Sequence, residues 1–146
     1  MIPPFDARGL LPPGGHWATW EEISERFGGN NHRQALLVGL RRALVALRRA
    51  GCGTVYLDGS FVTTKEHPAD FDACWSVSGV NDELLDPLLL DFSQDRAAQK
   101  AEYGGELFPA EWLTPGFGVA FLDFFQIDAA SGAGKGIVAV DLTGPV

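Results

Sequence analysis

The chain has 146 residues, which suffices for one domain of ordinary size and predicts a single domain over residues 1–146. Apolar residues make up 46% of the sequence and charged residues 21%, so the chain can bury a core and is not a disordered segment. The formal net charge of −8 argues against binding nucleic acid through a positive field over the whole surface, but a local basic patch would still allow contact with RNA.

Targeting and redox features predict a cytoplasmic protein that does not contact a membrane. No apolar run approaches the roughly 20 residues that cross a bilayer, and the N-terminus lacks the basic and apolar regions of a secretion signal. The two cysteines, Cys52 and Cys74, do not make a disulfide framework, which is typical of a reducing compartment.

Residues 1–18 are expected to form a Pro/Gly-rich arm that packs on the domain. The pairs Pro3-Pro4 and Pro12-Pro13 favour extended or turn backbone, and Gly14-Gly15 is expected to break any regular element. Directly after the arm, residues 19–22 have the Thr-x-x-Glu pattern of a capping box, which predicts a short helix through Phe27.

A longer helix is predicted from about residue 31 to residue 50. Asparagines at its start can cap it, and its leucines recur on one stripe, which is expected to face the core: Leu36, Leu40, Leu44 and Leu47. Four arginines lie off this stripe: Arg41, Arg42, Arg48 and Arg49. They are either an ordinary solvated helix face or a strip that binds phosphate or a partner.

The remainder of the chain alternates between strands and helices. Strands are predicted at residues 54–58 and 70–77, a broken helix at 82–103, a loop at 104–109, and further strands at 118–127 and 136–142. In the second strand Asp70 and Asp72 alternate with apolar residues that point the other way. This order predicts an α/β or α+β fold with a small mixed sheet flanked by helices.

Residues 57–73 carry the clearest chemical pattern. Asp70 and Asp72, two apart on a strand, project from the same face and can share divalent cations such as Mg²⁺ or Mn²⁺. Two such ions can clamp the attacking and leaving oxygens of a phosphoryl transfer. Gly59 at the end of the preceding strand lets backbone amides approach a phosphate, and Ser60 adds a hydroxyl donor.

Gly-Ser, nine further residues and then Asp-Phe-Asp resemble the signature of the nucleotidyltransferase fold superfamily shared with DNA polymerase β, and the chain is close in size to its minimal, MNT-like single-domain members. The resemblance implies a nucleotidyltransferase-like fold over roughly residues 30–142. It implies that Gly59 and Ser60 hold the triphosphate of a nucleotide such as ATP. Asp70 and Asp72 would bind two Mg²⁺ ions, and a third carboxylate on a later strand would complete the metal site.

The third carboxylate is assigned by pattern to Asp123. It lies between Phe121 and Phe125 on the predicted strand 118–127, where an unpaired charge would be costly and a metal or a partner is therefore expected. Asp141 and Asp128 are weaker alternatives. Asp123 would also help to deprotonate the acceptor hydroxyl.

Other polar residues near this segment stay open. Lys65, with His67, lies in the loop between the glycine turn and the aspartates and either reaches phosphate or is solvated. Arg96 and Lys100 share a helix face and either steady a nucleotide or solvate that face. Cys74 faces the aspartates and is interpreted as a small filler residue.

Two functions are therefore expected as alternatives. The first is a Mg²⁺-dependent nucleotidyltransferase that moves a nucleoside monophosphate from an NTP to an RNA, protein or small-molecule acceptor. By the same resemblance, it would act as part of a bacterial toxin–antitoxin pair or as a homodimer. The second is a non-catalytic, antitoxin-like module that binds a nucleotide or a partner.

Overall fold

The computed structural model describes all 146 residues and confirms a mixed α+β fold built on one five-stranded sheet. The strands are β1 (Gly14–Ala18), β2 (Thr54–Asp58), β3 (Phe71–Trp75), β4 (Gly105–Pro109) and β5 (Gly136–Asp141), in the order β1-β5-β2-β3-β4. The outer pairs β1–β5 and β3–β4 are parallel, and the central pairs β5–β2 and β2–β3 are antiparallel.

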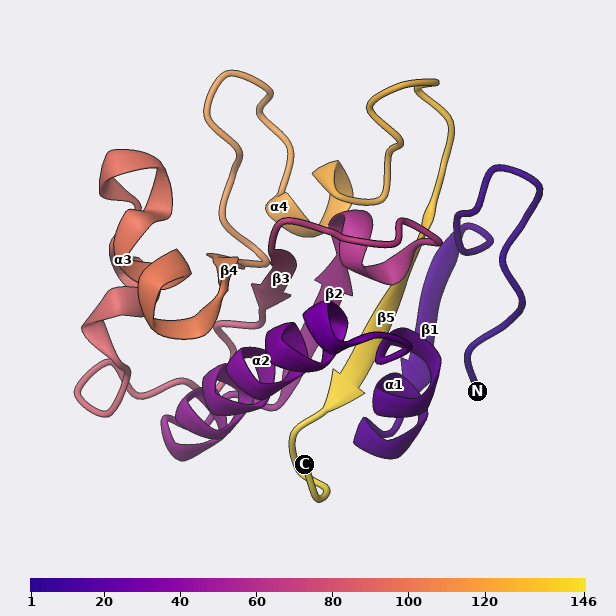
Figure 1. The fold of residues 1–146 in the computed structure, drawn as a ribbon. Coiled ribbons are helices and arrows are strands. Elements are labelled where there is room, and N and C mark those ends of the chain that lie inside the picture. Colours follow the sequence, from indigo (N-terminus) through magenta and orange to yellow (C-terminus); the bar gives the residue numbers. More distant parts are fainter.

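Two helices, α1 (Trp20–Phe27) and α2 (Asn31–Arg49), lie across one face of the sheet (Figure 1). Both begin as the sequence predicts: the Thr19–Glu22 capping box is present in α1, and the Asn30 side chain caps α2. All four leucines of the α2 stripe are buried in the core, together with Val55, Leu57, Phe71, Ala73 and Val138 from the strands. The main core therefore lies between the helices and this face of the sheet.

The third helix, α3 (Ser93–Tyr103), follows the 3₁₀ turn η2 (Pro87–Leu90) and packs beside β4. The buried Gln99 side chain donates to the carbonyl of Leu88 and accepts from the amide of Leu107, which ties α3 to both neighbours. Gly39 of α2 allows the close approach of α3, because a Cβ there would lie 1.8 Å from the carbonyl oxygen of Tyr103. These contacts fix β4 at the edge of the sheet.

Four expectations about secondary structure are wrong, the first being that the broken helix 82–103 begins at residue 82: residues 82–86 are not helical, residues 87–90 form η2, and the α-helix begins only at Ser93. The arm contributes the edge strand β1, and residues 105–109, expected as a loop, form β4. In both cases a glycine pair lies at the start of the strand, and the strand pairs with a partner that is distant in sequence. Residues 118–127 are not a strand but contain the short helix α4 (Phe121–Phe124). Phe121 and Phe125, four apart, both pack on the Phe108 ring, and this contact favours a helical turn.

The second face of the sheet carries the residues that alternate with the core positions. At one end of this face, the connection from β4 to β5 forms two projecting loops on either side of α4 (Figure 1). None of the helices has the length and apolar character that crossing a membrane requires. Both cysteines are free and buried.

Candidate functional site

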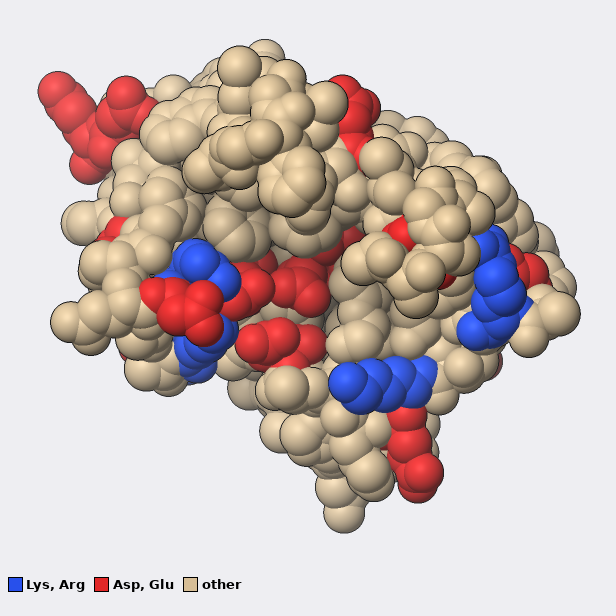
Figure 2. All heavy atoms as spheres, turned by 90° about the horizontal axis from the view of Figure 1, so that it is seen from above, with Lys and Arg blue, Asp and Glu red and all other residues tan.

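Three acidic residues form a row across neighbouring strands at the α4 end of the sheet. Asp58 of β2 is the register partner of Asp72 of β3, and Asp72 is the register partner of Glu106 of β4. Register partners project from the same face, so the three carboxyl groups lie side by side. Figure 2, which views the molecule from this end, shows acidic side chains gathered in a recess between the surrounding tan surfaces.

Asp58 is the most deeply buried member of this carboxylate row, with 1% of its surface exposed. One of its oxygens, Oδ1, has no hydrogen-bond partner, and Oδ2 accepts only a weak contact from the Cys74 thiol at 3.6 Å. Burial raises the pKa of Asp58 from its ordinary value of 3.8 to about 8. Burial and the neighbouring Asp58 likewise raise the pKa of Asp72. Without a cation, Asp58 and Asp72 therefore favour their protonated forms near neutral pH.

Glu106 and Asp70, the less buried acidic residues of the site, lie closer to the positive charges of Arg96 and Lys100. Burial alone would raise the pKa of Glu106, but hydrogen bonds from Arg96 and Lys100 outweigh it and lower the pKa. The Arg96 guanidinium lies 2.9 Å and the Lys100 ammonium 3.1 Å from Glu106 Oε1. Asp70, just before β3, is half-buried, and burial followed by repulsion from Glu106 raises its pKa. The two basic side chains thus lie beside the carboxylate row, not on an isolated helix face.

Gly59 places the chain directly against the carboxylate row. It has φ of +72°, and a Cβ at this position would lie 2.0 Å from Asp72 Oδ2, so a side chain is excluded both by conformation and by space. Gly59 and Ser60 begin the 3₁₀ turn η1 (Gly59–Val62). The Ser60 hydroxyl makes no hydrogen bond within the chain and is available to a ligand.

A buried arginine holds the loop that follows this turn. The Arg33 guanidinium of α2 donates to four carbonyl oxygens, those of Phe27 (3.1 Å), Phe61 (2.7 Å), Thr63 (2.9 Å) and Lys65 (2.6 Å). Burial without an acidic partner lowers the pKa of Arg33. The backbone of residues 61–65 is therefore fixed, whereas the Lys65 side chain is exposed and makes no contact with the carboxylate row.

The structure brings together four of the residues that the sequence singles out. Gly59, Ser60, Asp70 and Asp72 lie at the same end of the β2–β3 pair. Asp123, expected on a strand between phenylalanines, is instead exposed on α4. The two alternatives are held in local turns: the Asp128 carboxylate accepts from Ser131, and the Asp141 carboxylate accepts from Thr143 at the far end of β5.

Sequence reasoning missed Glu106 and Asp58. Glu106 lies in residues 104–109, which are predicted from the sequence to be a loop. A glycine pair followed by a polar residue and then Leu107 and Phe108 is the signal that could indicate the start of a strand there. In the sequence, Asp58 is only the last residue of the predicted strand 54–58. Its importance depends on its burial against Asp72, which no local pattern reveals.

The oxygen donors of this site suit a hard divalent cation. Carboxylates are the ligands that Mg²⁺ prefers, and the unpartnered Asp58 Oδ1 is a buried acceptor that a cation or its water could satisfy. As the side chains stand, no group of three or more His, Cys, Asp or Glu residues is arranged to hold a metal ion. Arg96 and Lys100 contact Glu106 through Oε1, so a cation that binds this oxygen would have to displace them.

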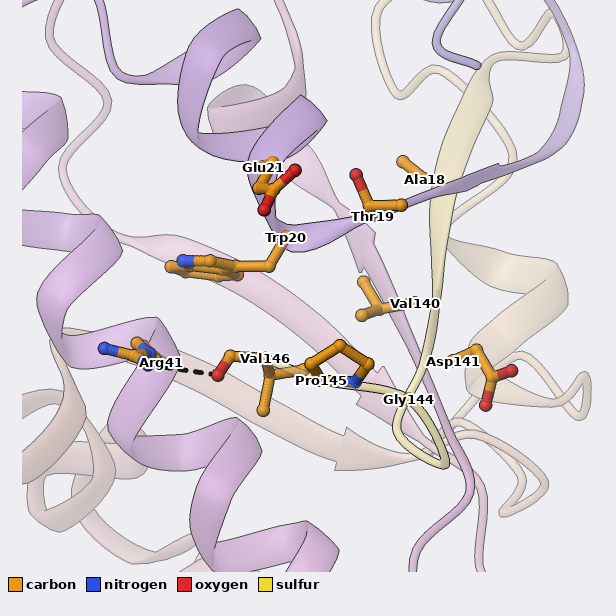
Figure 3. Close-up of a pocket in the computed structure, with 10 residues that line it drawn as sticks. All are labelled: Ala18, Thr19, Trp20, Glu21, Arg41, Val140, Asp141, Gly144, Pro145 and Val146. Carbon is orange, nitrogen blue, oxygen red and sulfur yellow. Dashed lines mark hydrogen bonds between the residues drawn. The ribbon is translucent and has the colours of Figure 1, made fainter.

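Two cavities differ sharply in their relation to the carboxylate row. An open, apolar pocket of about 570 Å³ reaches Gly59 and is lined mainly by the β4–β5 connection. A second pocket, of about 460 Å³, lies around Trp20, Arg41 and the C-terminal residues at the other end of β5 (Figure 3). There the Arg41 guanidinium donates to the carbonyl oxygen of Val146 at 3.0 Å. Only the apolar pocket adjoins the candidate site.

Comparison with known proteins gives one match and two negative results. No curated protein and no solved structure matches the chain. One protein-family model does match, and it spans residues 3–141, which include every strand and the whole carboxylate row. The chain therefore belongs to DUF6932, a family of unknown function.

Proposed function

We propose that the protein is a Mg²⁺-dependent nucleotidyltransferase that moves a nucleoside monophosphate from an NTP to an acceptor hydroxyl and releases pyrophosphate. One observation carries the proposal: the positive-φ turn at Gly59 packs directly against the carboxylate row of Asp58, Asp72 and Glu106. A turn that can bind phosphate and a group of carboxylates that can bind Mg²⁺ are the two parts that this reaction needs.

The position of each residue in the site suggests its role in this reaction. The backbone of Gly59 and the Ser60 hydroxyl would bind the triphosphate, and Asp70, Asp72 and Glu106 would hold the cations. Bound Mg²⁺ would supply charge neutralisation for the phosphates. Asp70 would be the general base. Its pKa is raised, so once ionised it accepts a proton from the acceptor hydroxyl better than an exposed carboxylate does. Arg96 and Lys100, beside Glu106, would add positive charge next to the phosphates.

Transfer of label from an NTP labelled at the α-phosphate tests this activity, with total RNA and cell lysate as separate sources of acceptor. Wild type with Mg²⁺ is expected to label an acceptor, and addition of EDTA is expected to stop the reaction. Asp72→Asn should abolish labelling, while Asp141→Asn, a matched aspartate at the far end of the same sheet face, should not. Labelling that survives Asp72→Asn would refute the proposed site.

Partners and location follow as parts of the same proposal. The acceptor can be RNA, a protein or a small molecule, and a toxin–antitoxin partner or a second copy of the chain would supply its recognition. The free, buried Cys52 and Cys74 agree with a cytoplasmic reaction. A different result would favour the non-catalytic binding module. Calorimetry would then show nucleotide binding, no acceptor would be labelled, and a partner would be captured from lysate.

A further inference from the structure

The apolar pocket beside Gly59 has no part in the chemistry described above. Its walls come from α4 and the two loops around it, and their apolar side chains are Phe117, Val119, Phe124, Phe125, Ile127 and Ala129. Phe117 and Phe124 approach each other with ring centroids 5.0 Å apart, and Phe124 meets Phe125 edge to face at 5.4 Å. The only charged side chain in the lining is Lys135. Such a cavity is suited to a flat, weakly polar ring.

We propose that this pocket binds the nucleobase of the NTP, an inference that rests on the proposed function. Gly59 is shared, because it both packs against Asp72 and lines the pocket. A nucleotide whose phosphates lie on the Gly59–Ser60 turn therefore has its nucleoside within reach of the phenylalanine rings. The volume of about 570 Å³ lies in the range of small-molecule sites.

The geometry of phosphoryl transfer argues against an acceptor in the same pocket. The attacking oxygen and the leaving pyrophosphate lie roughly in line on opposite sides of the α-phosphate. Pyrophosphate on the glycine turn therefore places the attacking oxygen away from that turn, whereas the pocket adjoins it. The base, which branches from the α-phosphate through the ribose, has no such constraint.

The lining also predicts how the base is recognised. None of the pocket side chains except Lys135 can form a hydrogen bond, and every base has a π face that can stack on phenylalanine. Lys135 makes no ion pair within the chain, and its charge acts on Asp58. Binding is therefore expected to tolerate both purines and pyrimidines, with Lys135 at the boundary between base and phosphates.

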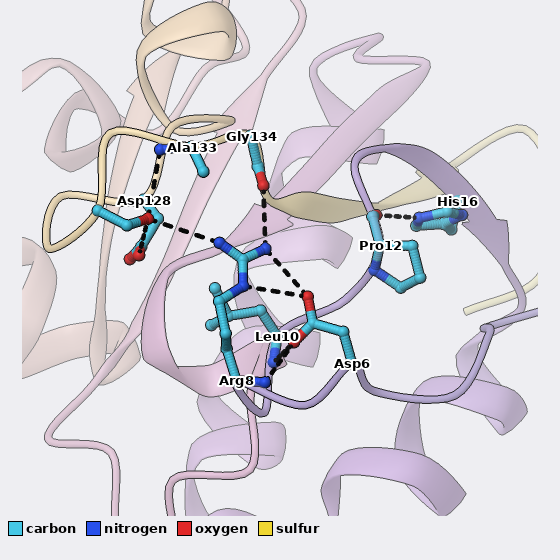
Figure 4. A network of polar contacts seen from close by, with 9 residues as sticks. Asp6, Arg8, Leu10, Pro12, His16, Asp128, Ala133 and Gly134 are labelled. Atoms are coloured by element: carbon cyan, nitrogen blue, oxygen red, sulfur yellow. Dashed lines mark hydrogen bonds and ion pairs between the residues drawn. The ribbon is translucent and has the colours of Figure 1, made fainter.

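The N-terminal arm holds one wall of the pocket in place (Figure 4). The Arg8 guanidinium donates to the Ser131 hydroxyl at 3.5 Å and to the Gly134 carbonyl at 3.3 Å, while the Asp6 carboxylate accepts from it at 3.0 Å. These contacts join the arm to the loop between Ile127 and Lys135. The wall is therefore formed before a nucleotide arrives, which lowers the cost of ordering it on binding.

Calorimetry with three probes tests the inference: ATP, CTP and inorganic tripolyphosphate, each with Mg²⁺. The variants are Phe117→Ala and Phe124→Leu, which remove a ring from the pocket. Phe117 is 69% exposed, so its removal should leave the fold intact. Trp17→Ala, at an exposed aromatic residue on β1 outside the pocket, is the matched control.

ATP and CTP are expected to bind wild type within about 10-fold of each other, and each pocket variant should weaken both by roughly 10-fold or more. Binding of tripolyphosphate should stay unchanged, as should all binding by Trp17→Ala. Unchanged nucleotide affinity in both pocket variants would overturn the inference. An equal loss for tripolyphosphate would also overturn it, because the rings would then act on the phosphates. A 100-fold preference for one base would refute recognition by stacking alone.

A separate measurement distinguishes failure of the pocket from failure of the proposed function. If neither ATP nor tripolyphosphate binds wild type, the transferase proposal fails. Saturation-transfer NMR with adenosine, which has no phosphate, then decides the pocket. Transfer from the phenylalanine rings to the adenine protons, lost in Phe124→Leu, would support a base-binding pocket on its own. Absence of transfer in wild type would overturn it.

Discussion

Asp58 and Asp141 end neighbouring strands on the same face of the sheet, but at opposite ends, and their surroundings differ completely. Asp58 is buried beside Asp72 with an unpartnered oxygen, and its pKa is raised to about 8. Asp141 is exposed, and hydrogen bonds from the Thr143 hydroxyl (2.6 Å) and amide (2.9 Å) lower its pKa. One end of the sheet is therefore electrostatically unsatisfied, whereas the other is satisfied by its own turn.

This difference separates a candidate binding site from ordinary surface. The chain stabilises the Asp141 carboxylate without help, since a hydroxyl two residues later caps it. The carboxylate row obtains no comparable help around Asp58, and crowded acids of this kind favour a cation or protons. An acidic residue that the fold leaves without partners is a position where a proton, a water molecule or an ion is expected.

The contrast between the Asp58 end and the Asp141 end of the sheet would be contradicted most directly if both ends contributed equally to catalysis. Asp72→Asn is expected to lower NMP transfer on the order of 100-fold or more, because charge neutralisation of the phosphates depends on the bound cation. Asp141→Asn should leave transfer near the wild-type rate. Single-turnover rates with α-labelled NTP measure both. Equal losses in the two variants would remove the distinction between the ends.

Substitution of two glycines, one packed against the carboxylate row and one without neighbours, tests how closely the turn packs on the row. Gly59→Ala should cost about 2–4 kcal/mol of stability, because the Cβ adds a clash with Asp72 to the strain of a positive φ. Gly116→Ala is the matched control: its φ of +82° carries the same strain, but no atom lies within 4 Å of the new Cβ. It should cost about 1 kcal/mol. Urea unfolding compares them, and equal costs would show that the carboxylate does not occupy that space.

The pH dependence of stability provides a third contrast. Between pH 4 and 8, Asp58 is ionised in the unfolded chain and protonated in the folded one, so unfolding releases a proton. The free energy of unfolding, measured in EDTA, should therefore fall as pH rises through this window. Asp58→Asn should make this fall shallower, with the remaining slope coming from Asp72, whose pKa is also raised, and should stabilise the protein by about 1–3 kcal/mol at pH 8.

Asp141→Asn is the control for the pH experiment. Its lowered pKa gives a contribution that is present above about pH 4 and lost below it, outside the window of Asp58. The slope between pH 5 and 8 should therefore match wild type. A wild-type protein whose stability rises across that window would contradict the burial of a protonated Asp58.

The smallest expected effect concerns the third cation ligand. Glu106→Gln should weaken Mn²⁺ binding in the presence of NTP by about 10-fold, because it removes one carboxylate charge next to Asp72. Asp123→Asn, at the exposed position that sequence reasoning favoured, should change it little. Titration of Mn²⁺ followed by electron paramagnetic resonance measures both. The reverse order of effects would restore Asp123 and exclude Glu106.

Local signals predicted the parts of the site that lie close together in sequence. The turn at Gly59 and the alternation around Asp72 are properties of short segments, and so are the capped starts of α1 and α2. Glu106 could not be found in this way, because its place depends on parallel pairing of β4 with β3. Asp123 was assigned wrongly to a strand, since a run of phenylalanines does not tell a strand from a helix that packs on Phe108.

The strand order has a consequence for how the chain is made. β5 lies between β1 and β2, so the first strand of the chain pairs only with the last one. During synthesis, Gly14–Ala18 would wait unpaired for about ten seconds until β5 emerges from the ribosome. The β2–β3 hairpin can form earlier, but its β2 edge also stays open until then. Docking of the final strand therefore closes two exposed edges in one step, and a nascent chain that stalls before residue 136 would be prone to aggregate.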